Sequence, residues 1–172
     1  MRITSSIVFI ISLLFLSTVA FAEGSVSEGL NQKVQPLLKA LSLIGTPYKF
    51  GGTNPEKGVD CSGFVRHVYK ESADIALPRS AKDMSQTGAA VSENELKPGD
   101  LVFFNTRKKD NSHVGIYAGN GEFVHASSSH AKKVTISNLT DNYWSARFNG
   151  ARRILTESIP DSISDSISSL SQ

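Results

Sequence analysis

Apolar positions follow a helical spacing in the first half of the chain and a strand spacing in the second half. The predicted helices cover residues 34–44, 61–72 and 80–87. After Pro98-Gly99, short β-rich runs alternate with turns, and the predicted strands cover residues 101–104, 113–118, 122–127, 134–137 and 148–154. Helices followed by an antiparallel meander are typical of an α+β domain, in which N-terminal helices pack on a sheet of about five strands.

Two of these helices begin at residues whose side chains can cap them. Asp60 directly precedes the helix at 61–72, and a carboxylate there accepts hydrogen bonds from the unpaired N–H groups of the first turn. Ser80, followed by Asp83, fits a capping box for the next, shorter helix. The segment 45–59 is rich in Gly, Pro and Asn and therefore predicts a loop.

The N-terminal segment has the pattern of an export signal. Arg2 precedes an unbroken apolar run at residues 7–16, and Ala-Phe-Ala at 20–22 has the form of a cleavage site. The apolar run is shorter than the ~20 residues that a membrane span needs. We therefore expect residues 1–22 to be a removed signal peptide, with an uncleaved anchor as the alternative. The mature protein would be exported, to the periplasm or the cell wall, without a stable membrane anchor.

Composition indicates one globular domain after the signal. The 172 residues are 40% hydrophobic and 20% charged, which is ordinary for a globular protein. Residues 23–155 would form the domain, and we expect it to act as a monomer. Residues 156–172 are Ser-rich and lack aromatic side chains, which predicts a mobile tail or, alternatively, a weakly amphipathic helix. A net charge of +2 argues against a nucleic-acid binder. A single cysteine excludes an intrachain disulfide.

Cys61, the only cysteine, is the first candidate for chemistry. A lone cysteine at a helix start is commonly a small buried apolar residue. In the first turn of a helix, however, unpaired N–H groups and the helix dipole favour an anion, which predicts a lowered thiol pKa. Cys61 shares a helix face with Val65 and Val68, so we expect its sulfur to point toward the surface on which that face packs.

His113 and His125 lie on adjacent predicted strands that form a hairpin around residues 119–121. With a three-residue turn, Gly115 pairs with His125, and the two histidines emerge on one face as a diagonal pair, about 7–8 Å apart at their backbones. A two-residue turn would shift the register by one and place them on opposite faces. A common face therefore requires an odd loop length or a bulge.

A thiol beside two imidazoles is the arrangement of a cysteine peptidase. Cys61 would be the nucleophile, His113 the base that takes its proton, and His125 the group that orients His113. The backbone N–H of Cys61 would donate to the oxyanion. Each residue alone also has a structural interpretation, as a buried cysteine or a satisfied sheet histidine. A Cys/His/His metal site is a further alternative, but the spacing of structural zinc ligands is absent, so we expect no metal and no cofactor.

Several stretches, in order along the chain, resemble the NlpC/P60 family of cell-wall cysteine peptidases. They are TPYKFGG at 46–52, DCSGFV at 60–65, LPRSAKDM at 77–84, KPGDLVFF at 97–104, SHVGIYAGNGEFVHAS at 112–127 and ARRI at 151–154. The resemblance is closest to small murein endopeptidases of Gram-negative bacteria, and it implies a papain-like α+β fold. It also implies hydrolysis of γ-D-glutamyl–diaminopimelate bonds, or of diaminopimelate-containing cross-links, in peptidoglycan stem peptides.

The same resemblance places Cys61 on the family nucleophile, His113 on the base and His125 on the orienting position. Tyr48 matches a tyrosine that borders the nucleophile and assists the oxyanion. The residues that match positions lining the substrate groove are Asp60, Ser62, Arg79 and Ser80. Structural interpretations stay open for several of them: the residues at 60 and 80 as helix caps, and Tyr48 as a packed loop aromatic.

Two other functions stay open at this point. One is an acyl or amide transferase that uses the same thiolate with an acceptor other than water, because hydrolysis and transfer share the acyl-enzyme. The other is a non-hydrolytic wall-binding module of the same fold, against which a complete Cys-His-His set argues. The sequence shows no wall-binding repeat, so we expect targeting to come from the groove itself or from a regulatory protein partner.

Overall fold

The computed structural model describes residues 34–106, 109–129 and 131–155 of the chain. The expected signal peptide at 1–22 and the expected tail at 156–172 lie outside the described residues. Within the described ranges, no helix is both long enough and apolar enough to cross a membrane.

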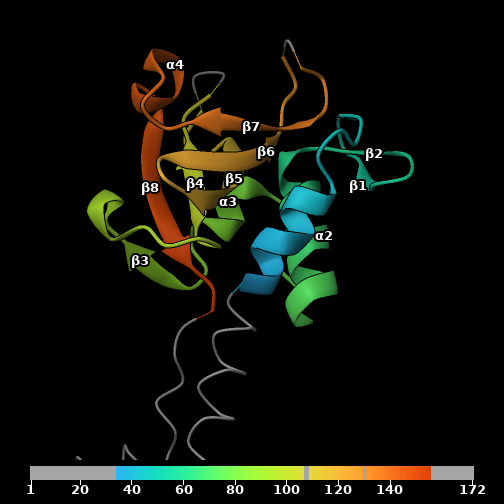
Figure 1. Ribbon diagram of the computed structural model, residues 1–172, viewed down its shortest axis with the longest axis horizontal. Coiled ribbons are helices and arrows are strands. Elements are labelled where there is room, and N and C mark those ends of the chain that lie inside the picture. Colours follow the sequence, from blue (N-terminus) through green and yellow to red (C-terminus); the bar gives the residue numbers. More distant parts are fainter. Residues whose placement is uncertain (1–33, 107–108, 130, 156–172) are drawn as a thin grey trace, which may run out of the picture.

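Six antiparallel strands form the main sheet, in the order β3-β8-β4-β5-β6-β7 (Figure 1). These strands are β3 (Ala89–Val91), β4 (Leu101–Phe104), β5 (His113–Gly119), β6 (Glu122–Ala126), β7 (Val134–Asn138) and β8 (Phe148–Arg153). A small hairpin precedes the first long helix and consists of β1 (Thr53–Asn54) and β2 (Gly58–Val59). The expected α+β class, with helices before an antiparallel sheet, is confirmed.

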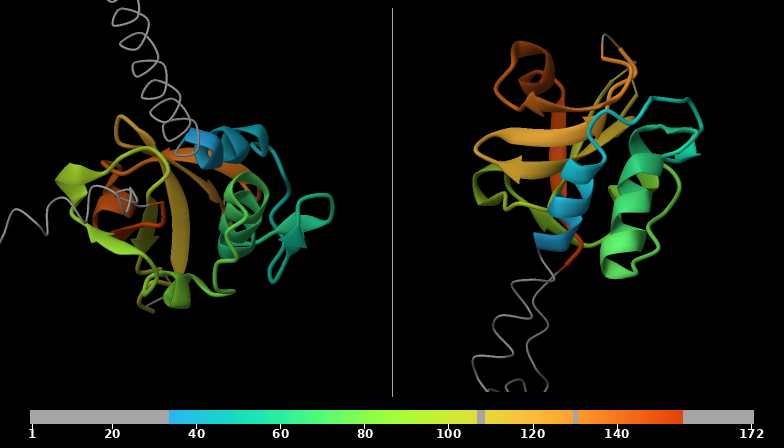
Figure 2. Two further views of the ribbon diagram at one scale, coloured as in Figure 1. Left: turned by 90° about the horizontal axis from the view of Figure 1, so that it is seen from below. Right: turned by 45° about the vertical axis from the view of Figure 1, so that its right-hand side comes forward.

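The helix at 34–42, α2 (Cys61–Ala73) and α3 (Ala81–Met84) pack on one side of the sheet, and the short α4 (Asn142–Ser145) packs on the other. Residues 34–42 are helical, and α2 is the longest helix with both ends among the described residues. The 3₁₀ turn η1 (Glu93–Glu95) lies between β3 and β4 along the chain. Figure 2 shows the helix at 34–42 beside α2 against the strands. The three predicted helices are present, although the first ends at residue 42 instead of 44 and the third is shorter than predicted; α4 was not predicted.

Two features of the sheet differ from the simple meander that the sequence suggests. β8 does not follow β7 but crosses back and pairs between β3 and β4. β3 adds a sixth strand of only three residues, which is too short to show the alternation that identifies a strand. Its Ala89 and Ala90 are exposed at the edge of the sheet.

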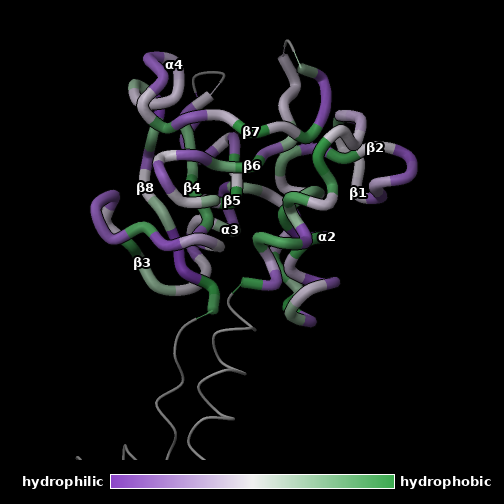
Figure 3. Tube along the Cα trace, in the orientation of Figure 1, coloured by the Kyte–Doolittle hydropathy of each residue, from purple (hydrophilic) through white to green (hydrophobic). Residues whose placement is uncertain are grey.

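Alternation along β4 divides the hydrophobic core into two clusters. Leu101 and Phe103 face the cluster that includes α2, whereas Val102 and Phe104 face a second cluster on the opposite side of the sheet. All four side chains are buried, so the sheet is covered on both faces here. Figure 3 shows the resulting distribution, with hydrophobic segments on the strands and α2 and a hydrophilic tip between β1 and β2.

Candidate active site

Cys61 is the first residue of α2, and Asp60 is the N-cap of that helix, as predicted. The helix begins here because the Asp60 carboxylate accepts a hydrogen bond from the backbone N–H of Gly63 at 2.7 Å. The half-buried Cys61 lines a cavity of about 680 Å³, and His113 lines the same cavity. The thiol and one of the two candidate imidazoles therefore open onto one space.

The histidines do not project from the sheet face that α2 covers. Val65 and Val68 pack with Val114 in the first core cluster. His113 directly precedes Val114 on β5, so its side chain lies on the other face, where it contacts Phe104. The leading end of α2 meets the first residue of β5 at the end of the strand rather than across the face of the sheet.

The hairpin between β5 and β6 contains the bulge that a common histidine face requires. Ile116 lies opposite Val124, as a three-residue turn would demand. The hairpin closes instead with a two-residue turn at 120–121, and a register shift between Tyr117 and Gly119 absorbs the extra residue. Of the two ways to obtain a common face, the chain therefore uses the bulge and not the three-residue turn. The predicted common face occurs, because the bulge restores the register.

The two imidazoles are joined by a hydrogen bond. Nε2 of His113 lies 2.9 Å from Nδ1 of His125, and the ring planes are nearly perpendicular, at 82°. His125 is 1% exposed and His113 is 7% exposed. Burial lowers the pKa of His125 to about 3, and the neighbouring His113 also lowers it. His125 is therefore neutral at physiological pH and can accept a proton in a hydrogen bond without taking up the charge.

The thiol lies in a less favourable environment for an anion than its helix position suggests. Burial raises the pKa of the Cys61 thiol, and the Asp60 carboxylate raises it further. Backbone hydrogen bonds from Val114 and from the first turn of α2 act in the opposite direction but do not outweigh these two causes. The prediction of a lowered thiol pKa is thus wrong in its net sign. The thiolate must form by proton transfer to an adjacent base.

Two residues that the sequence did not single out complete the histidine side. Oγ of Ser137 on β7 lies 2.9 Å from Nε2 of His125. The ring of Trp144 on α4 stacks on His113, with centroids 5.3 Å apart, and meets His125 edge-on at 4.9 Å. The register between β6 and β7 places Ser137, and an unpredicted one-turn helix places Trp144. The presence of a single tryptophan was the only signal in the sequence.

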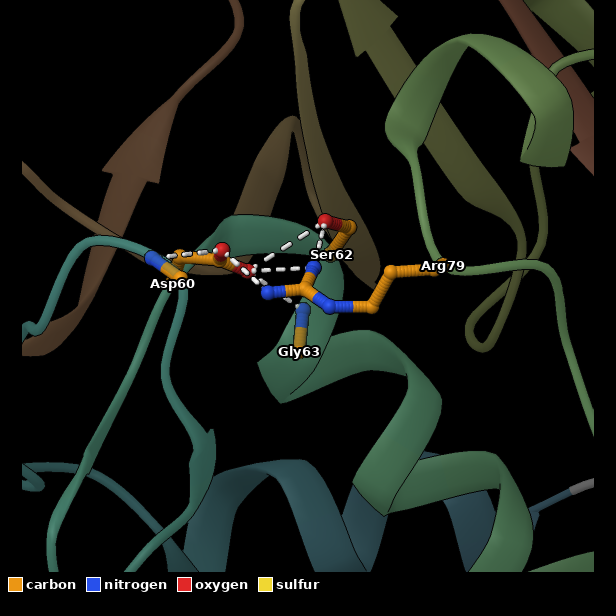
Figure 4. Close-up of polar contacts among 5 residues, drawn as sticks. Asp60, Ser62, Gly63 and Arg79 are labelled. Carbon is orange, nitrogen blue, oxygen red and sulfur yellow. Dashed lines mark hydrogen bonds and ion pairs between the residues drawn. The ribbon is translucent and has the colours of Figure 1, made fainter.

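On the opposite side of the thiol, Asp60 organises a polar network. Its two carboxylate oxygens accept hydrogen bonds from the two terminal nitrogens of Arg79, at 3.1 and 2.6 Å (Figure 4). The hydroxyl of Ser62 donates to Asp60 and accepts from Arg79 at 2.8 Å. The backbone N–H of Gly51 also donates to Asp60, which ties the preceding loop to the helix start. The side chain of Arg79 is 41% exposed, and its ion pair with Asp60 raises the pKa of Arg79.

All five expected groove residues line the cavity that holds Cys61: Tyr48, Asp60, Ser62, Arg79 and Ser80. The structural interpretations of two of them hold at the same time. Asp60 caps α2, and Ser80 caps α3 by accepting from the backbone N–H of Asp83 at 3.1 Å. Phe50, which the sequence did not single out, lines the same cavity and is 79% exposed. Among the described residues, no three His, Cys, Asp or Glu side chains are grouped so that they could hold a metal ion.

Comparison with known proteins gives this arrangement a family. Residues 45–153 match the NlpC/P60 family, which is more than half of the chain and includes every candidate site residue. The chain belongs to the NlpC/P60 family. The resemblance seen in the sequence motifs is therefore confirmed.

Similar NlpC/P60 proteins include curated enzymes and solved structures. The gamma-DL-glutamyl hydrolase of Bacillus subtilis is 47% identical over 71% of this chain and 29% of its own length. The murein DD-endopeptidase MepH of Escherichia coli is 38% identical over 78% of this chain and 52% of its own length. A crystal structure of an NlpC/P60 family protein from Bacillus cereus has a TM-score of 0.66 and 33% identity, covering 71% of this chain and 40% of that one. The chain thus spans between about a third and a half of these proteins.

Proposed function

We propose that this chain is a cysteine endopeptidase that hydrolyses peptide bonds in the stem peptides of peptidoglycan, with Cys61 as nucleophile, His113 as base and His125 as orienting group. The observation that carries the proposal is the 2.9 Å contact between the imidazoles, since His113 opens onto the same cavity as the only cysteine. Family membership and two relatives, named as a gamma-DL-glutamyl hydrolase and a murein DD-endopeptidase, support the substrate class.

The reaction would begin with transfer of the Cys61 proton to Nδ1 of His113, because Nε2 is engaged with His125. The thiolate attacks the carbonyl carbon of the scissile amide, and the oxyanion accepts hydrogen bonds from the backbone N–H of Cys61 and the hydroxyl of Tyr48. His113 then donates its proton to the leaving amine nitrogen, which breaks the C–N bond and leaves a thioester. Finally His113 deprotonates a water molecule, which attacks the thioester and releases the acid and the thiol.

The polar side of the cavity would bind the stem peptide. Arg79 lines the cavity beside the thiol, and the N–H groups that it does not give to Asp60 and Ser62 suit the carboxylates and carbonyls of such a peptide. Ser62 and Ser80 line the same cavity; their hydroxyls donate to Asp60 and Asp83, and their oxygens would accept from N–H groups of the peptide. Asp60 would act through Arg79, since both of its carboxylate oxygens hold that guanidinium in place. A substitution at Asp60 should therefore affect substrate binding without direct contact.

The proposal also covers the rest of the chain. An enzyme acting on peptidoglycan must reach the wall, which agrees with an export signal at residues 1–22, a domain at 23–155 and action in the periplasm or cell wall. Under this proposal the protein acts as a monomer, and the segment 156–172 is an appended tail.

Digestion of defined muropeptides tests the proposed function. Purified protein is incubated with muropeptides, and products are identified by mass spectrometry. Hydrolysis gives a free amine and a free carboxylic acid at one stem bond, and Cys61→Ala should abolish it while leaving the far-UV circular dichroism unchanged. Turnover by the Cys61→Ala variant would exclude the nucleophile assignment. A new amide in place of the free acid would show transfer rather than hydrolysis.

A further inference from the structure

Both ring nitrogens of His125 have hydrogen-bond partners. Nδ1 lies 2.9 Å from Nε2 of His113, and Nε2 lies 2.9 Å from Oγ of Ser137. A neutral imidazole carries one proton, so it donates at one nitrogen and accepts at the other. The position of that proton therefore depends on what His113 and Ser137 offer.

The proposed reaction fixes the direction of these hydrogen bonds. Once His113 has taken the thiol proton, both of its ring nitrogens carry hydrogen, so its Nε2 must donate. Nδ1 of His125 must then accept, which places the proton of His125 on Nε2. That N–H points at Ser137, whose hydroxyl oxygen is its acceptor at 2.9 Å. The same direction holds before the transfer, because Nδ1 of His113 can accept the thiol proton only when the proton of neutral His113 is on Nε2. The transfer then adds a positive charge to His113, which strengthens the hydrogen bonds from His113 to His125 and from His125 to Ser137.

Among the described residues, Ser137 is the only hydrogen-bond partner of Nε2 of His125. The side chain of His125 is 1% exposed, and the rings of Phe123 and Trp144 lie against it with centroids 4.9 Å away in each case. Neither ring offers a strong acceptor in the plane of the imidazole. An N–H left unpaired in such a place loses its hydration without compensation.

The charged and titratable groups near this chain of contacts lie on the thiol side. Cys61 comes from the start of α2, with the Asp60–Arg79 ion pair beside it. From β5 the titratable neighbour of His125 is His113. The described contacts that β4, β7 and α4 make with the two histidines come from Phe104, Ser137 and Trp144, none of which is charged.

We propose that Ser137 is a positioning residue, whose hydroxyl oxygen accepts the Nε2–H of His125 while His113 holds the thiol proton. This inference rests on the proposed function for its catalytic meaning. Whatever the substrate, Ser137 would stabilise the thiolate–imidazolium pair of Cys61 and His113 relative to the neutral thiol and imidazole. The reactivity of the thiol measures that balance without any peptidoglycan substrate.

Alkylation of Cys61 by iodoacetamide is the test, because the chain has a single cysteine. The second-order rate constant is measured from mildly acidic to alkaline pH for the wild type and for Ser137→Ala. Near neutral pH we expect Ser137→Ala to react about tenfold more slowly, since the ion pair loses the part-buried hydrogen bond between His125 and Ser137. The two rates should converge as the pH rises, because hydroxide then removes the thiol proton and His113 need not accept it.

Two further variants separate positioning from packing. Ser137→Thr keeps the hydroxyl on a residue suited to a strand and should restore most of the rate. Thr135 lies on β7 directly opposite His125, and its hydroxyl has only a 3.5 Å contact with the carbonyl of Ile136. Thr135→Val should therefore react like the wild type at every pH.

The proposal is overturned if Ser137→Ala alkylates at the wild-type rate near neutral pH. It is also overturned if the rate falls by the same factor at all pH values, because that is the signature of a packing defect. Failure of the wild type to cleave muropeptides, together with the expected alkylation profiles, would instead count against the proposed substrate alone.

Discussion

The two walls of the active-site cavity are built in opposite ways. The wall of β5, β6, β7 and α4 holds His113 and His125 among aromatic rings and excludes water from their contact. The wall at the start of α2 is charged and partly open, with Arg79 and Asp60 paired beside the thiol. A proton relay needs neutral, fixed partners, whereas a binding groove needs donors that a substrate can reach. Substitutions in the histidine wall should therefore reduce the rate of the chemical step, whereas substitutions in the charged wall should mainly affect substrate binding.

The largest effect should come from the base itself. His113→Ala removes the proposed acceptor of the thiol proton, so kcat/KM for muropeptide cleavage should fall by about 10³–10⁴-fold. His125→Ala removes the orienting partner and should cost about 10²-fold. His67→Ala, a histidine on α2 that does not line the cavity, is the matched control and should change little. A larger loss at His125 than at His113 would mean that their roles are reversed.

A crowding substitution tests how tightly the histidine wall is built. A Cβ at Gly115 would lie 2.6 Å from the ring of Phe123, 3.0 Å from the carbonyl oxygen of Val124 and 3.2 Å from Cβ of His125. Gly115→Ala should therefore displace His125, lowering kcat about tenfold and the free energy of unfolding by about 1–3 kcal/mol. Urea unfolding and steady-state kinetics measure the two effects. The double variant with Phe123→Leu should recover part of the loss, and no recovery would locate the strain elsewhere.

The charged wall can be altered without removing its helix cap. Asp60→Asn keeps an oxygen for the N–H of Gly63 but removes the charge that raises the pKa of the Cys61 thiol. That pKa should fall, so the alkylation curve of Cys61 should move to lower pH. KM should rise because Arg79 loses its partner, and the free energy of unfolding should drop by about 2 kcal/mol.

A second ion pair provides the control for this substitution. Asp100 and Arg153 form a similar two-pronged pair, at 2.8 and 2.6 Å, that does not line the active-site cavity. Asp100→Asn should destabilise the fold at least as much, since Asp100 is the more buried carboxylate, but leave the alkylation curve unchanged. Equal displacement of the curve by both variants would show that the effect is not local to the thiol.

The sequence predicted those parts of the site that depend on local rules. The start of α2 at Cys61 and its cap at Asp60 follow from capping preferences within one helical turn. The pairing of the two histidines follows from strand alternation, although the bulge that makes it possible depends on how the hairpin closes. The raised thiol pKa could not be anticipated, because burial depends on the packed fold whereas the dipole argument uses only the helix start.

Long-range placement explains the other omissions. Ser137 reaches His125 only through the register of β6 with β7, and Trp144 through a one-turn helix that no periodicity marks. The pairing of β8 with β4, and not with β7, is likewise a matter of long-range topology, which the alternating pattern within β8 does not encode. The family motifs include Cys61, His113 and His125, but not Ser137 and Trp144, which contact the histidines.

The smallest effect should come from the rim of the charged wall. Phe50 lines the cavity, and its side chain is 79% exposed. The hydrogen bond from the backbone N–H of Gly51 to Asp60 holds the loop that carries Phe50 in place. Phe50→Ala should raise KM about fivefold through lost apolar contact with the substrate, with kcat unchanged. Leu38→Ala, an exposed apolar residue that does not line the cavity, should change neither constant. A fall in kcat at unchanged KM would place Phe50 with the proton relay, and the division between the two walls would not hold.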